Sequence, residues 1–444
     1  MKTIKLRENF SEIVRKSSGN KNGYLYFSSN YKYIIIRTET KGQMMFFIIS
    51  ISVLFLIHLY IGIRIINPFD FSPMWKYLSF GVLFIMFLSP FLLFWFRTNG
   101  INKSLESLVG WIGYTWLGFA SLIFLLVLFR DLGWTLGTSV QKVYQLFSQS
   151  DSGTNEVTTF NSERRQFLIQ SMNFGLLGLS AIGTGYGLFE ARRRAAIVNI
   201  DIPLKNLPDA FNGFRIVQFS DLHVGPTIRN GFVKTIAKQI EQLQGDMIVF
   251  TGDLVDGSVE SLKNDVAPLK SLQAAFGKFF ITGNHEYYSG ALPWCDEAKN
   301  LGFDVLINEN RTISKGDAKI VLAGVTDISG GSFVSEHKSD PAKALGNTDS
   351  NFTKILLAHQ PRSIFEAAKV GYDLQLSGHT HGGQLIPWQY LTRLAQPYMW
   401  GLHKYENTWI YVNQGTGYWG PPLRIGARSE ITILHLIKES DKIT

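Results

Sequence analysis

Residues Phe214–Gly225 read FRIVQFSDLHVG and join a short apolar strand to a pair of polar side chains. Ile and Val lie between two phenylalanines in the first six positions, which is typical of a strand, and Asp221 and His223 follow directly. A helix is predicted next, over Gly231–Leu243. Further strands are predicted over Met247–Phe250, Phe279–Ile281, Lys354–Leu357 and Asp373–Leu376. This alternation predicts a layered α/β domain from about residue 200 onward.

Polar side chains follow each of the later strands as well. They stand in FTGDLVDG, ITGNHEY, LLAHQP and LSGHTHGGQ, and they are Asp253, Asp256, Asn284, His285, Glu286, His359, His379 and His381. Ligands bind at the carboxyl ends of strands in an α/β sheet, so we expect these side chains to meet at one edge. His379 and His381 alternate along the chain, so they share a site only through a bent turn, which the neighbouring glycines permit.

Oxygen and imidazole donors gathered in this way predict a metal site. The single cysteine, Cys295, excludes both an intrachain disulfide and a metal site built on thiolates. Imidazole and carboxylate ligands suit Mn²⁺, Fe or Zn²⁺, and affinity alone does not choose among these metals.

The motif order resembles that of the calcineurin-like metallophosphoesterases. It runs Asp-x-His, Gly-Asp-x-x-Asp, Gly-Asn-His-Glu, a lone His and Gly-His-x-His, over roughly residues 200–438. The layout, with apolar spans first and GHTHGGQ late, is similar to the transmembrane branch of that family, as is the closing stretch Asn413–Ile433. The resemblance implies a β-sandwich flanked by helices, in α-β-β-α layers, with two divalent metal ions at one end.

The resemblance also implies a role for each donor. Asp221, His223 and His381 would bind the first metal, while Asn284, His359 and His379 would bind the second. Asp253 would bridge both, and its carboxylate has two oxygens to share. His285 would be the acid near the leaving group, whereas Asp256 and Glu286 are expected to support the site rather than bind metal. Gln384 and Arg424 are further candidates, for substrate contact.

Apolar residues make up 45% of the 444-residue chain, and the excess lies in the first 190 residues. Three uncharged apolar runs are long enough to cross a bilayer: Met44–Ile63, Tyr77–Phe96 and Ser107–Phe129. A fourth run, Ser171–Phe189, follows the pair Arg164-Arg165 and fits either a stop-transfer anchor or a twin-arginine export signal.

We therefore predict three parts: a basic arm over residues 1–43, a membrane region over 44–189 with a polar linker at 147–163, and a metallophosphoesterase domain over 200–438. The protein is expected at the cell membrane as a multi-pass protein. Counting cations near the spans favours a cytoplasmic catalytic domain slightly, whereas an export signal would place it outside.

The predicted activity is hydrolysis of a phosphoester or pyrophosphate bond, on a substrate that is lipid-linked or lies at the membrane surface. The branch resembled includes enzymes that cleave the pyrophosphate of UDP-2,3-diacylglucosamine. A nuclease or nucleotide phosphodiesterase is the alternative enzyme, although no interleaved aromatic and basic groove predicts nucleic acid as a partner. The non-enzymatic alternative is a membrane scaffold with a relic metal site, for which a missing ligand would be the sign, and none is missing.

Overall fold

A computed structural model describes residues 24–29, 32–37, 41–100, 102–148, 162–349 and 351–439. The chain divides into two compact units, Met1–Ile63 and Arg64–Thr444. The first contains an antiparallel pair of strands, β1 (Tyr24–Ser29) and β2 (Lys32–Arg37), followed by helix α2 (Lys41–Ile61). Most of the predicted basic arm lies outside the described residues, and the predicted domain boundaries stay a prediction.

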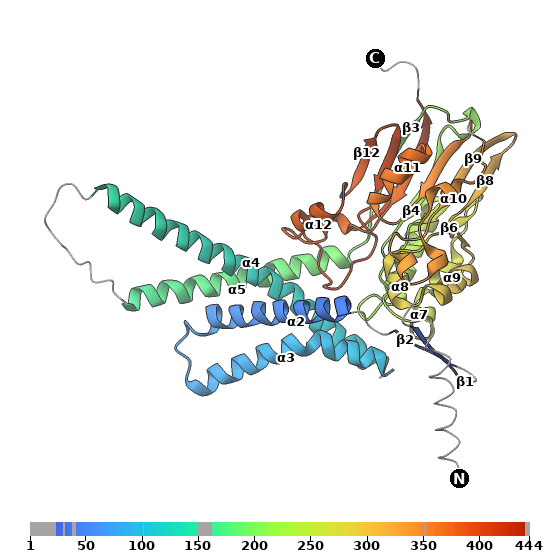
Figure 1. The fold of residues 1–444 in the computed structure, drawn as a ribbon. Coiled ribbons are helices and arrows are strands. Elements are labelled where there is room, and N and C mark those ends of the chain that lie inside the picture. The colour runs from blue at the N-terminus through green and yellow to red at the C-terminus, as the bar shows by residue number, and fades with distance from the viewer. Residues whose placement is uncertain are drawn as a thin grey trace, which may run out of the picture. The chain divides into compact units, whose positions relative to one another are not determined.

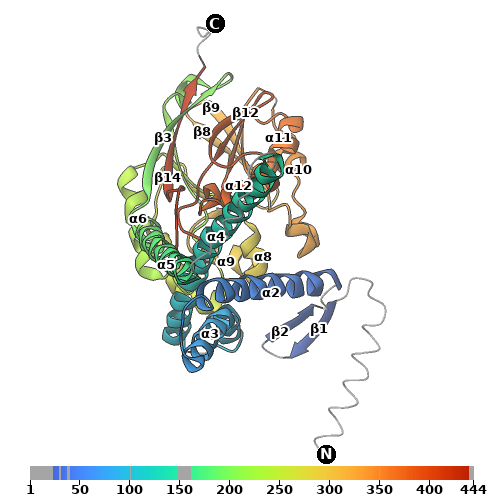
Figure 2. The same cartoon turned by 90° about the vertical axis from the view of Figure 1, so that its left-hand side faces the viewer.

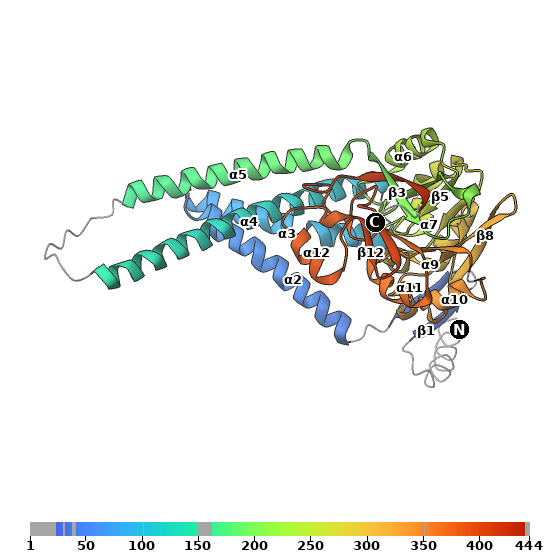
Figure 3. The same cartoon turned by 90° about the horizontal axis from the view of Figure 1, so that it is seen from above.

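The second unit begins with three long helices, α3 (Pro73–Thr98), α4 (Lys103–Ser148) and α5 (Ser162–Arg192). With the segment Ile48–Ile66, they give four helices that are long and apolar enough to cross a membrane. Figure 3 shows α4 and α5 running alongside each other. The predicted linker at 147–163 lies largely outside the described residues.

Helix α4 continues well past the predicted span Ser107–Phe129. Arg130 and Asp131 do not end the helix, because they form an ion pair with each other at 2.9 Å and Arg130 hydrogen-bonds Asn173 of α5. A charge that would mark the end of a span is thus neutralised between packed helices, and the helix proceeds through it.

Two six-stranded sheets follow the helices, and Figure 1 shows them stacked face to face. The first has the order β3-β14-β4-β5-β6-β7, from β3 (Ala196–Leu204), β14 (Glu430–Lys438), β4 (Phe214–Phe219), β5 (Met247–Phe250), β6 (Lys278–Phe280) and β7 (Asp304–Val305). The second has the order β12-β13-β11-β10-β9-β8, from β12 (Gly401–Tyr405), β13 (Thr408–Val412), β11 (Leu374–Ser377), β10 (Thr353–Leu357), β9 (Ala318–Gly324) and β8 (Glu309–Lys315).

Parallel pairing sets the direction of the strands that carry the polar motifs. β4, β5 and β6 are parallel neighbours in the first sheet, and β9, β10 and β11 are parallel neighbours in the second. The predicted strands therefore exist, with ends shifted by one residue at most, but they belong to two sheets rather than to one sheet edge.

Alternation along the strands explains why both faces of each sheet are covered. In β4, Ile216 points into the core between the sheets and Val217 points to the core beneath the outer helices. The outer core of the first sheet packs under α6 (Asn230–Leu243), α7 (Val259–Val266) and α9 (Ala291–Asn300). That of the second packs under α10 (Pro341–Leu345) and α11 (Ile364–Val370).

Figure 2 shows the resulting layers, with α6 outside one sheet and α10 and α11 outside the other. The α-β-β-α sandwich expected from the resemblance is confirmed, and so are the preceding apolar helices. The short helices α8 (Asn284–Ser289) and α12 (Gln389–Ala395) lie in the connections at the strand ends.

Candidate metal centre

All seven predicted metal donors lie at the carboxyl ends of parallel strands. Asp221 and His223 follow β4, Asp253 follows β5 and Asn284 begins α8 just after β6. The second sheet supplies the other three donors, His359 after β10 and His379 with His381 after β11. The face-to-face stacking of the sheets brings the two sets together.

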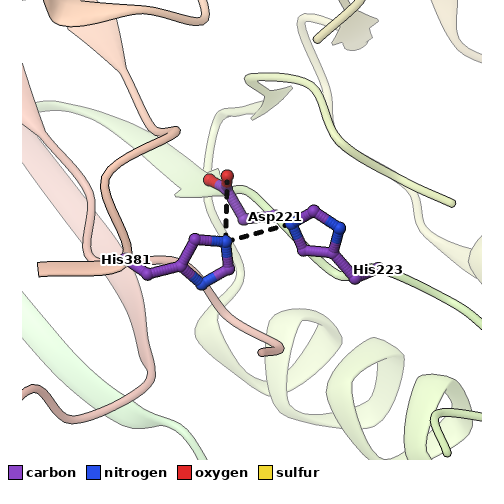
Figure 4. A group of neighbouring side chains, drawn as sticks. All are labelled: Asp221, His223 and His381. Carbon is purple, nitrogen blue, oxygen red and sulfur yellow. Dashed lines mark hydrogen bonds and ion pairs between the residues drawn. The ribbon is translucent and has the colours of Figure 1, made fainter. Parts of the chain in front are cut away.

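Three groups of three possible ligands form within this cluster: two consist of predicted metal donors, and the third is His223, Asp256 and His285. In each of the groups Asp221–His223–His381 and Asp253–His359–His379, one ligand atom per residue lies within 4.8 Å of the others. Figure 4 shows the first group, in which His381 Nε2 lies 3.0 Å from His223 Nε2 and 3.5 Å from Asp221 Oδ1. In the second, His379 Nδ1 lies 3.2 Å from His359 Nε2.

Asp253 belongs to the second group and also lies close to the first. One of its oxygens, Oδ2, is 3.1 Å from His359 Nε2 and 3.7 Å from His223 Nε2. The side chain is buried, so each of its oxygens faces donors rather than solvent. This is the position from which one carboxylate can contact two cations.

Asn284 provides an independent test of whether these residues fit a metal. Its Oδ1 is buried and has no hydrogen-bond partner, although an unsatisfied buried acceptor is costly. Its amide also hydrogen-bonds Tyr288. A cation beside Oδ1 would satisfy this oxygen, so the residues present fit a bound metal.

The protonation of two histidines in the cluster suits metal binding, whereas for His359 burial is outweighed by Asp253, which raises the pKa of that ring well above its usual range. Burial lowers the pKa of His379 to about 3, with the charge of His359 acting in the same direction. Burial, with His223 and Arg424, likewise holds the pKa of His381 well below its usual range. Both rings are therefore neutral at pH 7 and have lone pairs available, as metal ligands require.

The backbone conformation at these residues sets the direction in which the donor side chains point. Five of the seven have positive φ, from 50° at His223 to 72° at His379, and the others are Asp221, Asp253 and His381. Such left-handed conformations are uncommon outside glycine and cluster at functional sites. The bent turn expected at His379 and His381 is thus made partly by the histidines themselves.

Two motif glycines are needed for close approach rather than for a turn. A Cβ on Gly283 would overlap the Asp253 carboxylate, and a Cβ on Gly378 would overlap Ser220 and Asp221. Any larger residue at either position would displace a metal donor.

Asp256 contacts two histidines, His223 and His285, and forms with them the third group of side chains that could hold a metal ion. Its Oδ1 accepts from His285 Nδ1 at 2.6 Å and lies 3.3 Å from His223 Nδ1. A carboxylate behind a ligating histidine fixes its tautomer and orientation. The expectation that Asp256 supports the site agrees with this geometry.

His285 lies beside the predicted metal donors and shares the third group with His223 and Asp256. Its ring centroid is 4.5 Å from that of His223, and the edges of Tyr288 and Trp419 flank it. Burial lowers its pKa, but Asp253 and the hydrogen bond that His285 donates to Asp256 outweigh burial and raise the pKa to about 9. His285 therefore carries a proton at neutral pH in this arrangement.

Glu286 fixes the loops that hold the donors. It is fully buried and accepts from three backbone N–H groups, those of Gly283 at 2.6 Å, Leu254 at 2.7 Å and Asp253 at 2.9 Å. One carboxylate therefore joins the loop after β5 to the loop after β6. The sequence placed Glu286 only near the site, because this role depends on two loops that meet in three dimensions.

Arg424 and Gln384 also hold loops. Arg424 is fully buried and donates to the carbonyl groups of Gln414, Gly415 and Gly417, so it does not present itself to substrate. Gln384 donates to the Trp419 carbonyl at 2.9 Å and accepts from the Trp419 N–H at 2.9 Å. Trp419 beside His285 was missed from the sequence, since nothing local marks a lone tryptophan as part of a site.

Residues 214–383 match the model of the calcineurin-like phosphoesterase family. A transmembrane protein with metallophosphoesterase domain from Danio rerio is 36% identical over 57% of this chain and 60% of its own length. An uncharacterized metallophosphoesterase from Helicobacter pylori strain J99 is 37% identical over 67% of this chain and 79% of its own. This chain thus spans about 60% of the first of these relatives.

Among solved structures, a putative 5'-nucleotidase from Staphylococcus aureus in complex with alpha-ketoglutarate is 11% identical. The match covers 52% of this chain and 55% of that one, with a TM-score of 0.32.

Proposed function

Because the chain belongs to the calcineurin-like metallophosphoesterase family, we propose that it is a membrane-anchored hydrolase that cleaves phosphoester bonds with two divalent metal ions. The observation that carries the proposal is the pair of three-donor groups, one of which includes Asp253, together with the buried Oδ1 of Asn284, which has no hydrogen-bond partner.

The proposed ligands are Asp221, His223 and His381 for one cation and Asn284, His359 and His379 for the other, with Asp253 shared. When bound, a metal pair of this kind lowers the pKa of water and offsets charge on the phosphoryl oxygens. Mn²⁺, Fe and Zn²⁺ all suit the donors.

His285 is the proposed general acid. Its Nδ1 is held by Asp256 at 2.6 Å, which leaves Nε2 free of that bond and able to give a proton to a departing oxygen. Trp419 and Tyr288 flank the ring and limit its rotation. Asp256 in this role is a positioning residue.

The substrate is proposed to be lipid-linked or held at the membrane surface. Support comes from the four apolar helices and from relatives named as transmembrane proteins. The catalytic domain is proposed to face the cytoplasm, on the slight excess of cations that this orientation places inside.

The test is hydrolysis of bis(p-nitrophenyl) phosphate by the full-length protein in detergent micelles. Chelator-stripped protein is expected to be inactive and to recover on addition of Mn²⁺. Protein that binds Mn²⁺ stoichiometrically and hydrolyses no ester would favour the scaffold instead.

A further inference from the structure

Helix α12 turns an apolar face outward from the catalytic domain. Tyr390, Leu391 and Leu394 are all exposed, and Leu394 is the most exposed of them, at 85%. Residues three and four apart lie on the same side of a helix, so these three side chains form one patch. Ile386, just before the helix, is exposed as well. Large apolar side chains that gather on a surface indicate contact with another molecule or with lipid.

The residues around this patch are of the kinds found at a membrane interface. The segment Leu385–Trp400 reads LIPWQYLTRLAQPYMW and contains two tryptophans and two tyrosines. Both residue types are enriched where the apolar core of a bilayer meets the headgroups. Arg393 is the only charged residue of the segment, and its guanidinium carbon lies 5.4 Å from the centre of the Trp400 ring. A cation beside aromatic rings suits contact with anionic headgroups.

Hydrogen bonds connect this segment to one of the helices that are apolar enough to cross a membrane. The Ile386 N–H donates to the Ile425 carbonyl at 3.0 Å, and the Arg424 N–H donates to the Gly187 carbonyl of α5 at 3.0 Å. Leu423 packs at the same place, because a Cβ added to Gly187 would lie 3.2 Å from Leu423 Cβ. One short loop, residues 423–425, thus contacts both α5 and the start of the α12 segment.

The contact with α5 lies near one boundary of the apolar region. Gly187 stands about one turn before Glu190 and Arg192, the charged residues that end the apolar run. Its neighbours Tyr186 and Phe189 are exposed, so the apolar surface of α5 continues to this level. Figures 1 and 3 show α12 on the side of the sandwich from which the long helices extend. A bilayer around α5 would therefore bring its headgroup layer to α12.

We propose that α12 is an interfacial helix, which binds the surface of the bilayer beside α5. Tyr390, Leu391 and Leu394 insert among the lipids, and Arg393 binds headgroup phosphates. Amphipathic helices of this kind lie about 5–10 Å into the boundary between headgroups and acyl chains. The long apolar helices already anchor the chain, so this contact sets the orientation of the catalytic domain rather than its attachment.

Both ends of the α12 segment are attached to the turn over residues 378–383, which carries two of the predicted metal donors. At one end Gln389 packs against Gly383, where an added Cβ would lie 2.2 Å from Gln389 Cβ. At the other end Thr380 Oγ1 donates to the Met399 carbonyl at 2.5 Å. Contact between α12 and lipid therefore holds this turn at a set distance from the bilayer surface. The contact itself does not depend on the proposed hydrolysis.

The experiment measures whether α12 lies in the bilayer surface, using the full-length protein in nanodiscs of phosphatidylcholine and phosphatidylglycerol. Leu394→Cys is labelled with the environment-sensitive dye NBD in a Cys295→Ala background, because Cys295 is the single cysteine of the chain. Lipids with a nitroxide on the headgroup quench a dye that lies at the bilayer surface. We expect the label to lose about half of its emission or more, since an interfacial helix lies within roughly 10 Å of the nitroxide.

Lys369→Cys, labelled in the same background, is the matched control. Lys369 is exposed on α11, which has seven residues like α12 but packs on the outer face of the second sheet. A dye at this position should stay in water and keep its emission.

A second label position tests the apolar face itself. Tyr390→Cys carries the dye one turn earlier on the same face and should be quenched like the label at 394. Adding Leu394→Glu should remove most of the quenching at 390, because a carboxylate is costly to take out of water, whereas adding Leu394→Met should keep it. The thermal unfolding midpoint and metal content report whether each variant is folded.

The outcomes separate lipid from the other possible occupants of this face. Labels at 390 and 394 that are quenched no more than the label at 369 would refute the contact with the bilayer. Blue-shifted emission without quenching, together with energy transfer to a labelled second copy in the same nanodisc, would also refute it, in favour of a dimer through α12. If the labels are quenched but the unlabelled wild-type protein hydrolyses no bis(p-nitrophenyl) phosphate with Mn²⁺, the interfacial helix stands and the proposed function fails.

Discussion

Replacing Glu286 by alanine should destabilise the protein and empty the metal site together. The substitution leaves three buried N–H groups, of Asp253, Leu254 and Gly283, without their acceptor. Each unsatisfied donor costs about 1–3 kcal/mol, and water entering the vacated space recovers part, so we expect a net loss of about 3–5 kcal/mol. For a domain of this size that is a fall of roughly 6–20 °C in the thermal midpoint.

Metal content should fall in the same variant, because the loops released by Glu286 carry Asp253 and Asn284. The assay combines thermal unfolding in detergent micelles, followed by tryptophan fluorescence, with metal analysis by mass spectrometry. Glu286→Gln keeps one acceptor oxygen and should lie between wild type and alanine.

Glu366→Ala is the matched control. Glu366 is exposed and pairs with Lys369 one turn away, at 2.7 Å, and such surface pairs contribute about 0–1 kcal/mol. If Glu286→Ala shifts the midpoint no further than Glu366→Ala and keeps its metal, the carboxylate does not organise the loops and the reasoning is wrong.

Three further predictions concern the reaction and its location. Asp253→Asn and His379→Ala should each reduce turnover about 10²-fold or more and lower metal content, and full metal occupancy in either would exclude that residue as a ligand. His285→Ala should keep its metal and lose about 10²–10⁴-fold with poor leaving groups but little with p-nitrophenol, whereas equal losses on both would contradict the acid role. A reporter fused to the carboxyl terminus, active only in the cytoplasm, should be active, and an inactive reporter that is nevertheless expressed would place the domain outside.

Local sequence patterns were sufficient to predict the individual strands and helices of the catalytic domain. The strand before Asp221 ends at Phe219 as predicted, and the helix predicted over Gly231–Leu243 begins one residue earlier. In both cases the hydrophobic spacing directly reports which face is buried. The order of the five motifs was enough to propose all seven metal donors.

The parts that the sequence did not indicate depend on non-local contacts. β14 pairs between β3 and β4 although it lies more than 200 residues further along the chain, and no local pattern specifies that partner. Division of the donors between two sheets has the same origin. Within α4, Arg130 hydrogen-bonds Asn173 of another helix, a partner that no local pattern indicates.

The left-handed backbone at five predicted metal donors affects the stability of the whole fold. Non-glycine residues in that region cost about 1 kcal/mol or more each, and the surrounding hydrogen bonds must hold them there at all times. Cation binding at the proposed site would offset part of this cost. Selection for heat resistance alone would first replace these strained residues with ones that avoid the left-handed backbone. Selection for turnover would retain them.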